Sequence, residues 1–145
     1  MNILVSACLL GVNCKYDGGN NLREELKELA DKHNLVPFCP EVYGGLTTPR
    51  VPSERLGDKV VNKEGIDVTE NFVRGAEEAL RMAQTFDCKY AIFKAKSPSC
   101  GCGKIYDGTF TGTLTDGDGV TTELLKKHGI TVVTENELSK IKRLS

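Results

Sequence analysis

Three short apolar segments of this chain each lead into a cysteine. They are residues 3–5 before Cys8, 35–38 before Cys39 and 90–93 before Cys100. These compact runs lack regular polar alternation, a pattern typical of strands with both faces buried. The carboxyl ends of parallel strands lie along one edge of a sheet, where ligands bind. We therefore expect the three thiols to meet at that edge.

Helical patterns separate these segments along the chain. The sequence predicts strands at 2–7, 35–39, 89–95 and 130–133, helices at about 21–33, 67–85 and 120–128, and a last short helix starting near 134–137. Two hairpins are expected, at 59–68 and 105–110, and residues 40–56 have the composition of a long irregular loop. Strands that alternate with helices predict an α/β fold. We expect a single domain over 1–145, with a mostly parallel sheet and helices on both faces, in Rossmann-like or flavodoxin-like layers.

Two local features belong to the predicted helices. Asn21 and Glu24 resemble a capping box at the start of helix 21–33. Gly75 lies inside helix 67–85, where glycine costs about 1 kcal/mol of helix propensity relative to alanine. We therefore expect Gly75 to pack closely against another backbone segment.

Composition limits the class of protein. The chain has six cysteines and no basic segment followed by an apolar stretch at its start, so we expect a cytoplasmic protein whose thiols stay reduced. A net charge of -1 and a pI near 6.1 predict neither a nucleic acid nor a membrane partner. The expected partner is a small molecule, and the sequence does not specify an oligomeric state.

The cysteines favour metal binding over nucleophilic catalysis. The two histidines, His33 and His128, fall at predicted helix ends, where a structural role suffices, so a cysteine–histidine dyad is disfavoured. Soft thiolates select iron–sulfur clusters or zinc. Three thiolates on a [4Fe-4S] cluster leave one iron without a protein ligand, able to act as a Lewis acid, whereas a fourth thiolate closes the cluster. Zinc held by three thiolates and water is the alternative metal. Cys88 reads as a small buried hydrophobe, and Cys14 and Cys102 remain undecided.

Polar residues near the cysteines allow two interpretations each. Glu41 follows Cys39 by two residues and is either an acid/base group or an exposed loop carboxylate. Ser97 and Ser99 either orient a substrate or water, or bond the backbone of their turn. Arg50 adds polarity to the same edge or forms a structural ion pair.

Several sequence blocks resemble the DUF523 family. The matching blocks are Ser6-Ala7-Cys8-Leu9-Leu10-Gly11, Tyr16-Asp17-Gly18, Cys39-Pro40-Glu41, Gly44-Gly45-Leu46, Pro49-Arg50, Asp67-Val68-Thr69, Gly75-Ala76, Ser97-Pro98-Ser99-Cys100-Gly101 and Ile105-Tyr106-Asp107-Gly108. In these blocks the chain is similar to the thiouracil desulfidases that depend on a [4Fe-4S] cluster. Two features depart from the pattern: Lys15 stands where arginine is expected, and Cys102 is an extra thiol.

The resemblance implies a role for each residue type. It implies cluster ligation by Cys8, Cys39 and Cys100, acid/base catalysis by Glu41 with help from Ser97 and Ser99, and substrate binding by Tyr16, Asp17 and Arg50. The implied reaction is non-redox hydrolysis of a C–S bond in a small thiolated heterocycle such as 2-thiouracil. The substrate sulfur would bind the iron that lacks a protein ligand, and sulfide would be released. The alternative is a non-catalytic iron–sulfur or sulfur-binding module, such as a cluster carrier or redox sensor, with Cys102 or Cys14 as a fourth thiolate.

Overall fold

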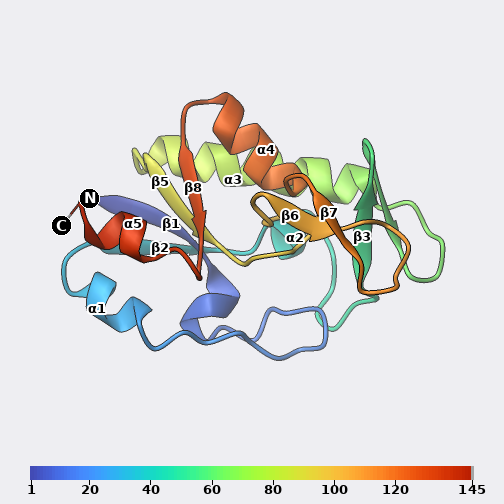
Figure 1. Ribbon diagram of the computed structural model, residues 1–145, viewed down its shortest axis with the longest axis horizontal. Helices are drawn as coiled ribbons and strands as arrows, with labels where there is room; N and C mark the ends of the chain where they lie inside the picture. The colour runs from blue at the N-terminus through green and yellow to red at the C-terminus, as the bar shows by residue number, and fades with distance from the viewer. Residues whose placement is uncertain (145) are drawn as a thin grey trace.

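The four predicted strands form one parallel sheet in the computed structural model, which describes residues 1–144 (Figure 1). Its strands are β1 (Asn2–Ser6), β2 (Asn34–Phe38), β5 (Tyr90–Phe93) and β8 (Thr131–Thr134). Their order in space is β2-β1-β5-β8, and every neighbouring pair is parallel. The strand order reverses between β1 and β5, as in flavodoxin-like sheets. The predicted α/β fold is confirmed, although residue 145 of the predicted domain lies outside the described residues.

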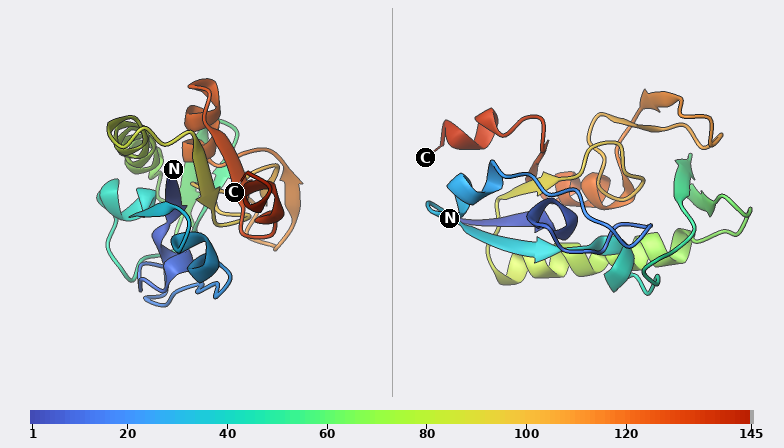
Figure 2. Two further views of the ribbon diagram at one scale, coloured as in Figure 1. Left: turned by 90° about the vertical axis from the view of Figure 1, so that its left-hand side faces the viewer. Right: turned by 90° about the horizontal axis from the view of Figure 1, so that it is seen from below.

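Helices cover both faces of the sheet, as Figure 2 shows. One face carries α3 (Thr69–Thr85) and α4 (Val120–Lys127), and the other carries α1 (Leu26–Ala30) and α5 (Ser139–Lys142). A 3-10 helix, η1 (Ala7–Leu10), follows β1, and the short helix α2 (Pro40–Tyr43) follows β2. Along residues 1–144, no helix combines the length and apolar character needed to cross a bilayer.

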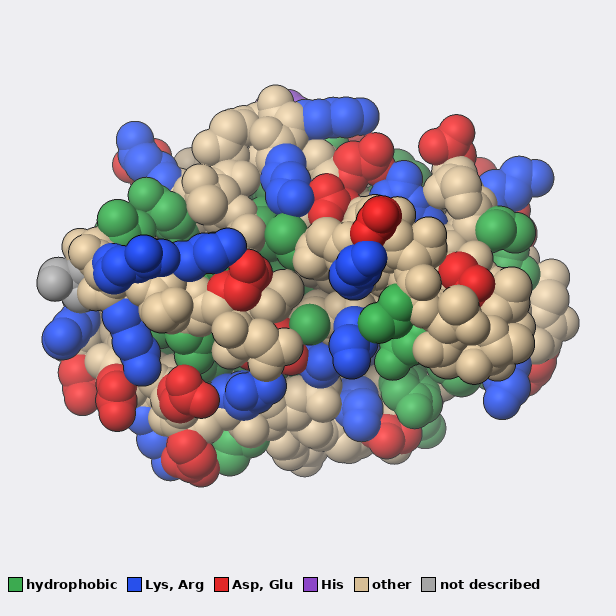
Figure 3. Space-filling model, viewed as in Figure 1, with side chains coloured by type: hydrophobic (Ala, Val, Ile, Leu, Met, Phe, Trp, Pro, Cys, Tyr) green, Lys and Arg blue, Asp and Glu red, His purple; other side chains and the backbone are tan. Residues whose placement is uncertain are grey.

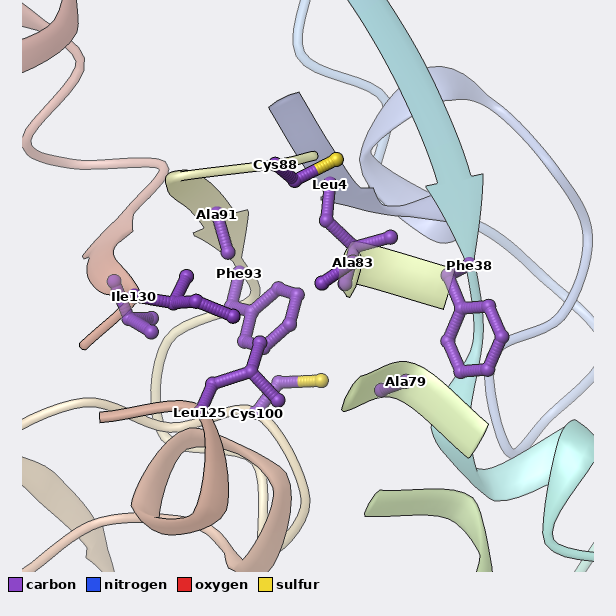
Figure 4. Close-up of a cluster of buried hydrophobic side chains, with 11 residues drawn as sticks. Leu4, Phe38, Ala79, Ala83, Cys88, Ala91, Phe93, Cys100, Leu125 and Ile130 are labelled. Carbon is purple, nitrogen blue, oxygen red and sulfur yellow. The ribbon is translucent and has the colours of Figure 1, made fainter. Parts of the chain in front are cut away.

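Side-chain alternation along β1 divides the core into two clusters. Leu4 packs on the α3 and α4 side, whereas Ile3 and Val5 pack on the α1 and α5 side, because successive strand residues point to opposite faces. Figure 4 shows the first cluster, with Phe93 near its middle and Leu125 of α4 beside it. Both layers of helices are therefore held to the sheet by buried apolar surface.

Two small antiparallel hairpins extend the fold beyond the carboxyl ends of the sheet strands (Figure 1). They are β3 (Ser53–Leu56) with β4 (Lys59–Asn62), and β6 (Lys104–Tyr106) with β7 (Leu114–Asp116). The predicted hairpin at 59–68 is present as a short one: Val61 and Asp67 form an antiparallel bridge, and the backbone N–H groups of Asn62 and Val68 donate to the carbonyls of Ile66 and Val60 at 2.9 Å. The longer pairing of β4 is with the polar segment Ser53–Leu56, which the sequence did not predict as a strand. The predicted loop at 40–56 therefore contains α2 and β3. The second hairpin closes through residues 107–113 and not through a tight turn at Asp107-Gly108.

The helix predicted at 21–33 is also shorter than expected. Its regular part covers only Leu26–Ala30, and Asn21 does not cap it. Instead, the Asn21 backbone N–H donates to the Cys8 carbonyl at 2.9 Å, and its side-chain amide approaches the Cys8 sulfur at 3.5 Å. Contact with the cysteine loop therefore replaces the local capping interaction at this position.

Candidate functional site

Three strand ends bring Cys8, Cys39 and Cys100 into one pocket. Cys8 lies in η1 after β1, Cys39 directly follows β2, and Cys100 lies in the turn after β5. All three line a cavity of about 600 Å³. This is the edge where the strand order reverses, the usual ligand position in open α/β sheets.

Close backbone approaches at glycines fix two of the cysteine loops. A Cβ built on Gly75 of α3 would lie 2.0 Å from the carbonyl oxygen of Pro40, which follows Cys39. A Cβ on Gly119, just before α4, would lie 2.4 Å from the carbonyl oxygen of Ser99. The close packing predicted for Gly75 is confirmed. Helices α3 and α4 therefore hold the backbone next to Cys39 and Cys100.

Arg50 joins Glu41 to the loop that carries Cys14. The Arg50 side chain is 7% exposed, and its Nε donates to Glu41 Oε1 at 3.0 Å. Its Nη1 donates to Thr48 Oγ1 at 3.0 Å, and its Nη2 donates to the Cys14 carbonyl at 2.8 Å. Burial raises the pKa of Glu41, and the charge and hydrogen bond of Arg50 act against that rise.

Neighbouring side chains act on the pKa of each of the three predicted ligand sulfurs. Burial raises the pKa of Cys8 and of Cys100, and this rise is opposed by the amide of Asn21 at Cys8 and by the hydroxyl of Ser6 at Cys100. The Cys14 side chain lowers the pKa of Cys39 to about 7, against the effect of burial, and the Cys39 thiol lies 3.8 Å from the Cys14 carbonyl, to which it donates. The interaction between the two side chains raises the pKa of Cys14.

The donor set fits an iron–sulfur cluster. Hydrogen bonds directed at sulfur stabilise the thiolate form that binds metal. The thiols at Cys8, Cys39 and Cys100 also interact unfavourably with one another when charged, and bound iron would offset that repulsion. Among residues 1–144, no three His, Cys, Asp or Glu side chains converge on a position for a single metal ion. In a [4Fe-4S] cluster each thiolate binds a different iron, so convergence on one atom is not required.

The remaining predicted residues divide between the pocket and its surroundings. Tyr16 and Ser97 line the pocket. Ser97 Oγ accepts the backbone N–H groups of Ser99 and Cys100 at 3.1 and 3.0 Å, so its own hydroxyl hydrogen can point elsewhere. Asp17 is exposed and outside the lining, with its Oδ1 accepting the N–H of Gly19 at 2.9 Å.

Ser99 and two cysteines also lie outside the lining. Ser99 is buried, and its hydroxyl is 3.0 Å from Thr121 Oγ1, so it supports the Cys100 turn from the α4 side. Cys102 donates to the carbonyl of Val132 at 3.6 Å, and Cys88 is a buried core residue, as predicted. Cys14, which lines the pocket, is therefore the fourth thiol at the site.

Several residues that line the pocket were not predicted from the sequence as site residues. They are Ser6, Asn21, Glu54, Lys94 and Phe110. Lys94 immediately follows β5, and its Nζ pairs with the buried carboxylate of Glu135 at 3.0 Å. A charged residue at a strand end was a signal for Lys94, whereas Glu54 lies in the predicted irregular loop at 40–56 and Phe110 at the end of the predicted hairpin at 105–110.

The pocket lining carries more cations than carboxylates. The cations are Lys15, Arg50, Lys63, Lys94 and Lys96, and the carboxylates are Glu41 and Glu54. In the middle of the face seen in Figure 3, Lys and Arg side chains lie next to hydrophobic ones. Such a lining favours a ligand with apolar surface on which negative charge is present or develops.

Comparison with known proteins gives consistent matches. Residues 3–137 match the family model described as 2-thiouracil desulfurase. The chain is 43% identical to an uncharacterized protein of Bacillus subtilis (strain 168), YbbK, over 96% of this chain and 99% of the relative. It is also similar to the solved structure of the [4Fe-4S]-dependent thiouracil desulfidase TudS. That match has a TM-score of 0.94 and 46% identity, and covers 99% of this chain and 96% of the other.

Proposed function

Since this chain belongs to the 2-thiouracil desulfurase family, we propose that it is a [4Fe-4S]-dependent enzyme that removes sulfur from a small thiolated heterocycle such as 2-thiouracil. The observation that carries the proposal is the pocket in which Cys8, Cys39 and Cys100 line one cavity. The similarity to the [4Fe-4S]-dependent thiouracil desulfidase TudS supports the same cofactor here.

The three thiols would hold the cluster. A cluster bound by three thiolates supplies an iron without a protein ligand, a Lewis acid to which a substrate sulfur can bind. Asn21 and Ser6 would keep their ligands oriented, as outer hydrogen-bond donors commonly do at metal sites. Lys94, which interacts with Cys8 through its charge, would stabilise negative charge near that ligand.

Glu41 is proposed as the acid/base group. Water adds oxygen to the carbon that carries sulfur, and sulfide leaves, so 2-thiouracil and water give uracil and hydrogen sulfide without any net oxidation. Glu41 would take a proton from the attacking water and return it to the departing sulfur. Arg50 holds Glu41 Oε1, which fixes the carboxylate orientation that a proton transfer requires. Ser97 would donate its hydroxyl hydrogen to the substrate.

The test is sulfide release by protein purified without oxygen. We expect iron and acid-labile sulfide in the purified protein, and uracil with sulfide from 2-thiouracil. Cys8→Ser, Cys39→Ser and Cys100→Ser should lose the cluster, whereas the control Cys102→Ser, outside the pocket, should keep it. Glu41→Gln should retain the cluster but lose about 10²- to 10⁴-fold in rate. Full activity in metal-free protein, or zinc as the bound metal, would refute the proposal.

A second candidate is a non-catalytic cluster carrier or redox sensor. It is favoured by Cys14, the additional thiol that lines the pocket and interacts with Cys39, because a fourth thiolate would close the cluster. Electron paramagnetic resonance of the reduced cluster, with and without 2-thiouracil, separates the candidates. A signal that changes with 2-thiouracil supports the enzyme, and a signal that changes only in Cys14→Ser supports the closed cluster.

We also propose that the protein acts in the cytoplasm as a single domain on a small thiolated substrate. All six cysteines are free thiols, a state that a reducing compartment maintains. Fractionation of cells that express a tagged chain tests the location.

A further inference from the structure

Phe110 adopts a backbone conformation that a bulky residue rarely takes. Its φ is +58°, in the left-handed region where the side chain crowds the backbone. Such conformations persist only where the surroundings enforce them, and they concentrate at active sites and ligand clamps. Phe110 lies in the 107–113 connection of the β6–β7 hairpin, outside the main sheet.

Glu54 of β3 enforces this conformation. Its Oε1 accepts the backbone N–H of Gly108 at 3.0 Å and that of Phe110 at 3.1 Å. Glu54 is only 9% exposed, and pairing with Val61 across the β3–β4 hairpin fixes its backbone. One nearly buried carboxylate therefore sets the position of the loop on either side of residue 109.

The loop places Phe110 in the lining of the cysteine pocket. Three other aromatic residues belong to that lining: Tyr106 lies within β6, where pairing with Leu114 fixes its backbone, and the other two already have partners for their rings. Phe38 stacks on Tyr43 with ring centroids 4.5 Å apart, and Lys15 Nζ lies 5.6 Å from the centre of the Tyr16 ring. Phe110, in contrast, is half-buried and belongs to neither core cluster of the described residues.

We propose that Phe110 provides the stacking surface for the planar ring of the substrate, with Glu54 as its positioning residue. The inference rests on the proposed function only in taking the substrate to be a planar heterocycle. A flat heterocycle stacks on an aromatic side chain through the face of its ring, so the contact depends on planarity and little on which substituents the ring carries. Phe110 would therefore select flat heterocycles over puckered ones, while the three cysteines of the pocket would select for sulfur.

The first experiment compares binding of uracil and 5,6-dihydrouracil to the holoenzyme by anaerobic calorimetry. These compounds carry the same polar groups, but only uracil has a flat conjugated ring. Phe110→Ala should weaken uracil binding by about 5- to 100-fold, with a much smaller effect on dihydrouracil. Phe110→Tyr should bind both compounds like the wild type. The control Phe86→Ala removes a ring that is 44% exposed and outside the pocket, and should change neither affinity.

The second experiment is a double-mutant cycle between Glu54 and Phe110. Glu54→Ala leaves both N–H groups without this acceptor, so the loop should lose its fixed position. Phe110→Ala should then cost much less uracil affinity in the Glu54→Ala background than in the wild type. Glu54→Gln keeps an acceptor oxygen and should restore most of the Phe110 contribution.

The two proposals fail in different ways. A wild-type holoenzyme that binds uracil but releases no sulfide from 2-thiouracil would refute the proposed function, and the binding comparison would still decide the role of Phe110. Equal losses for uracil and dihydrouracil in Phe110→Ala, an unchanged uracil affinity, or a wild type that binds neither compound would overturn the stacking inference.

Discussion

Substitution of Gly75 by alanine tests whether α3 holds the Cys39 segment by direct backbone contact. The added Cβ would lie 2.0 Å from the Pro40 carbonyl oxygen and 2.8 Å from the Pro40 carbonyl carbon. Ordinary contact begins at 3.4 Å, so the two backbones would have to separate by 3.4 − 2.0 = 1.4 Å. Neither side can relieve this contact by rotating a side chain.

The expected cost follows from two opposing effects. Overpacking costs about 1–3 kcal/mol, and we take the upper value because backbone meets backbone. Alanine regains about 1 kcal/mol of helix propensity. The net prediction for Gly75→Ala is a loss of about 2 kcal/mol in the free energy of unfolding, which lowers Tm by about 6 °C in a domain of this size.

Urea and thermal unfolding measure this change, with Arg74→Ala as the control. Arg74 is exposed on the same helix, so its substitution should stay within about 0.5 kcal/mol of the wild type. Because Pro40 follows Cys39, Gly75→Ala should also bind less iron after anaerobic purification. If Gly75→Ala were as stable as the wild type, or more stable by about the 1 kcal/mol of helix propensity that alanine regains, the close approach of α3 to Pro40 would be refuted.

Three further substitutions test other contacts of the site and fold. Gly119→Ala would place a Cβ 2.4 Å from the Ser99 carbonyl oxygen, and should lower both Tm and iron content by displacing the turn of Cys100. Arg50→Met leaves the 19%-exposed side chain of Glu41 without its cation, so urea unfolding should show a loss of about 3 kcal/mol; an unchanged midpoint would exclude a stabilising pair. The pKa of Glu137 is lowered, first by its lysine partner and then by a backbone N–H, so its contribution to stability is present above the unfolded pKa near 4.5 and is lost as the pH falls through the lower folded pKa. Glu137→Gln should therefore be less stable than the wild type at pH 7 in thermal unfolding, with the difference shrinking as the pH falls below 4.5. A difference independent of pH would contradict this account.

Outer contacts of the site depend on segments far apart along the chain. Asn21 was expected to cap a helix, yet its amide approaches Cys8. Arg50 lies next to a loop signal in the sequence, but its guanidinium connects Glu41 with the carbonyl of Cys14. The polar segment Ser53–Leu56 has no strand pattern, and it becomes a strand because it pairs with Lys59–Asn62.

The sequence by itself determined the parallel α/β fold, the strand ends that carry Cys8, Cys39 and Cys100, and the close packing of Gly75. These properties follow from local periodicity and from the rule that parallel strands end at one edge, so a single chain reveals them. Only the tertiary structure decided that Cys14 and not Cys102 is the fourth thiol in the pocket, and that Ser99 supports a turn outside it. The physical reason is that each of these outcomes depends on which distant segment meets a side chain, and hydrophobic patterning carries no information about such polar contacts.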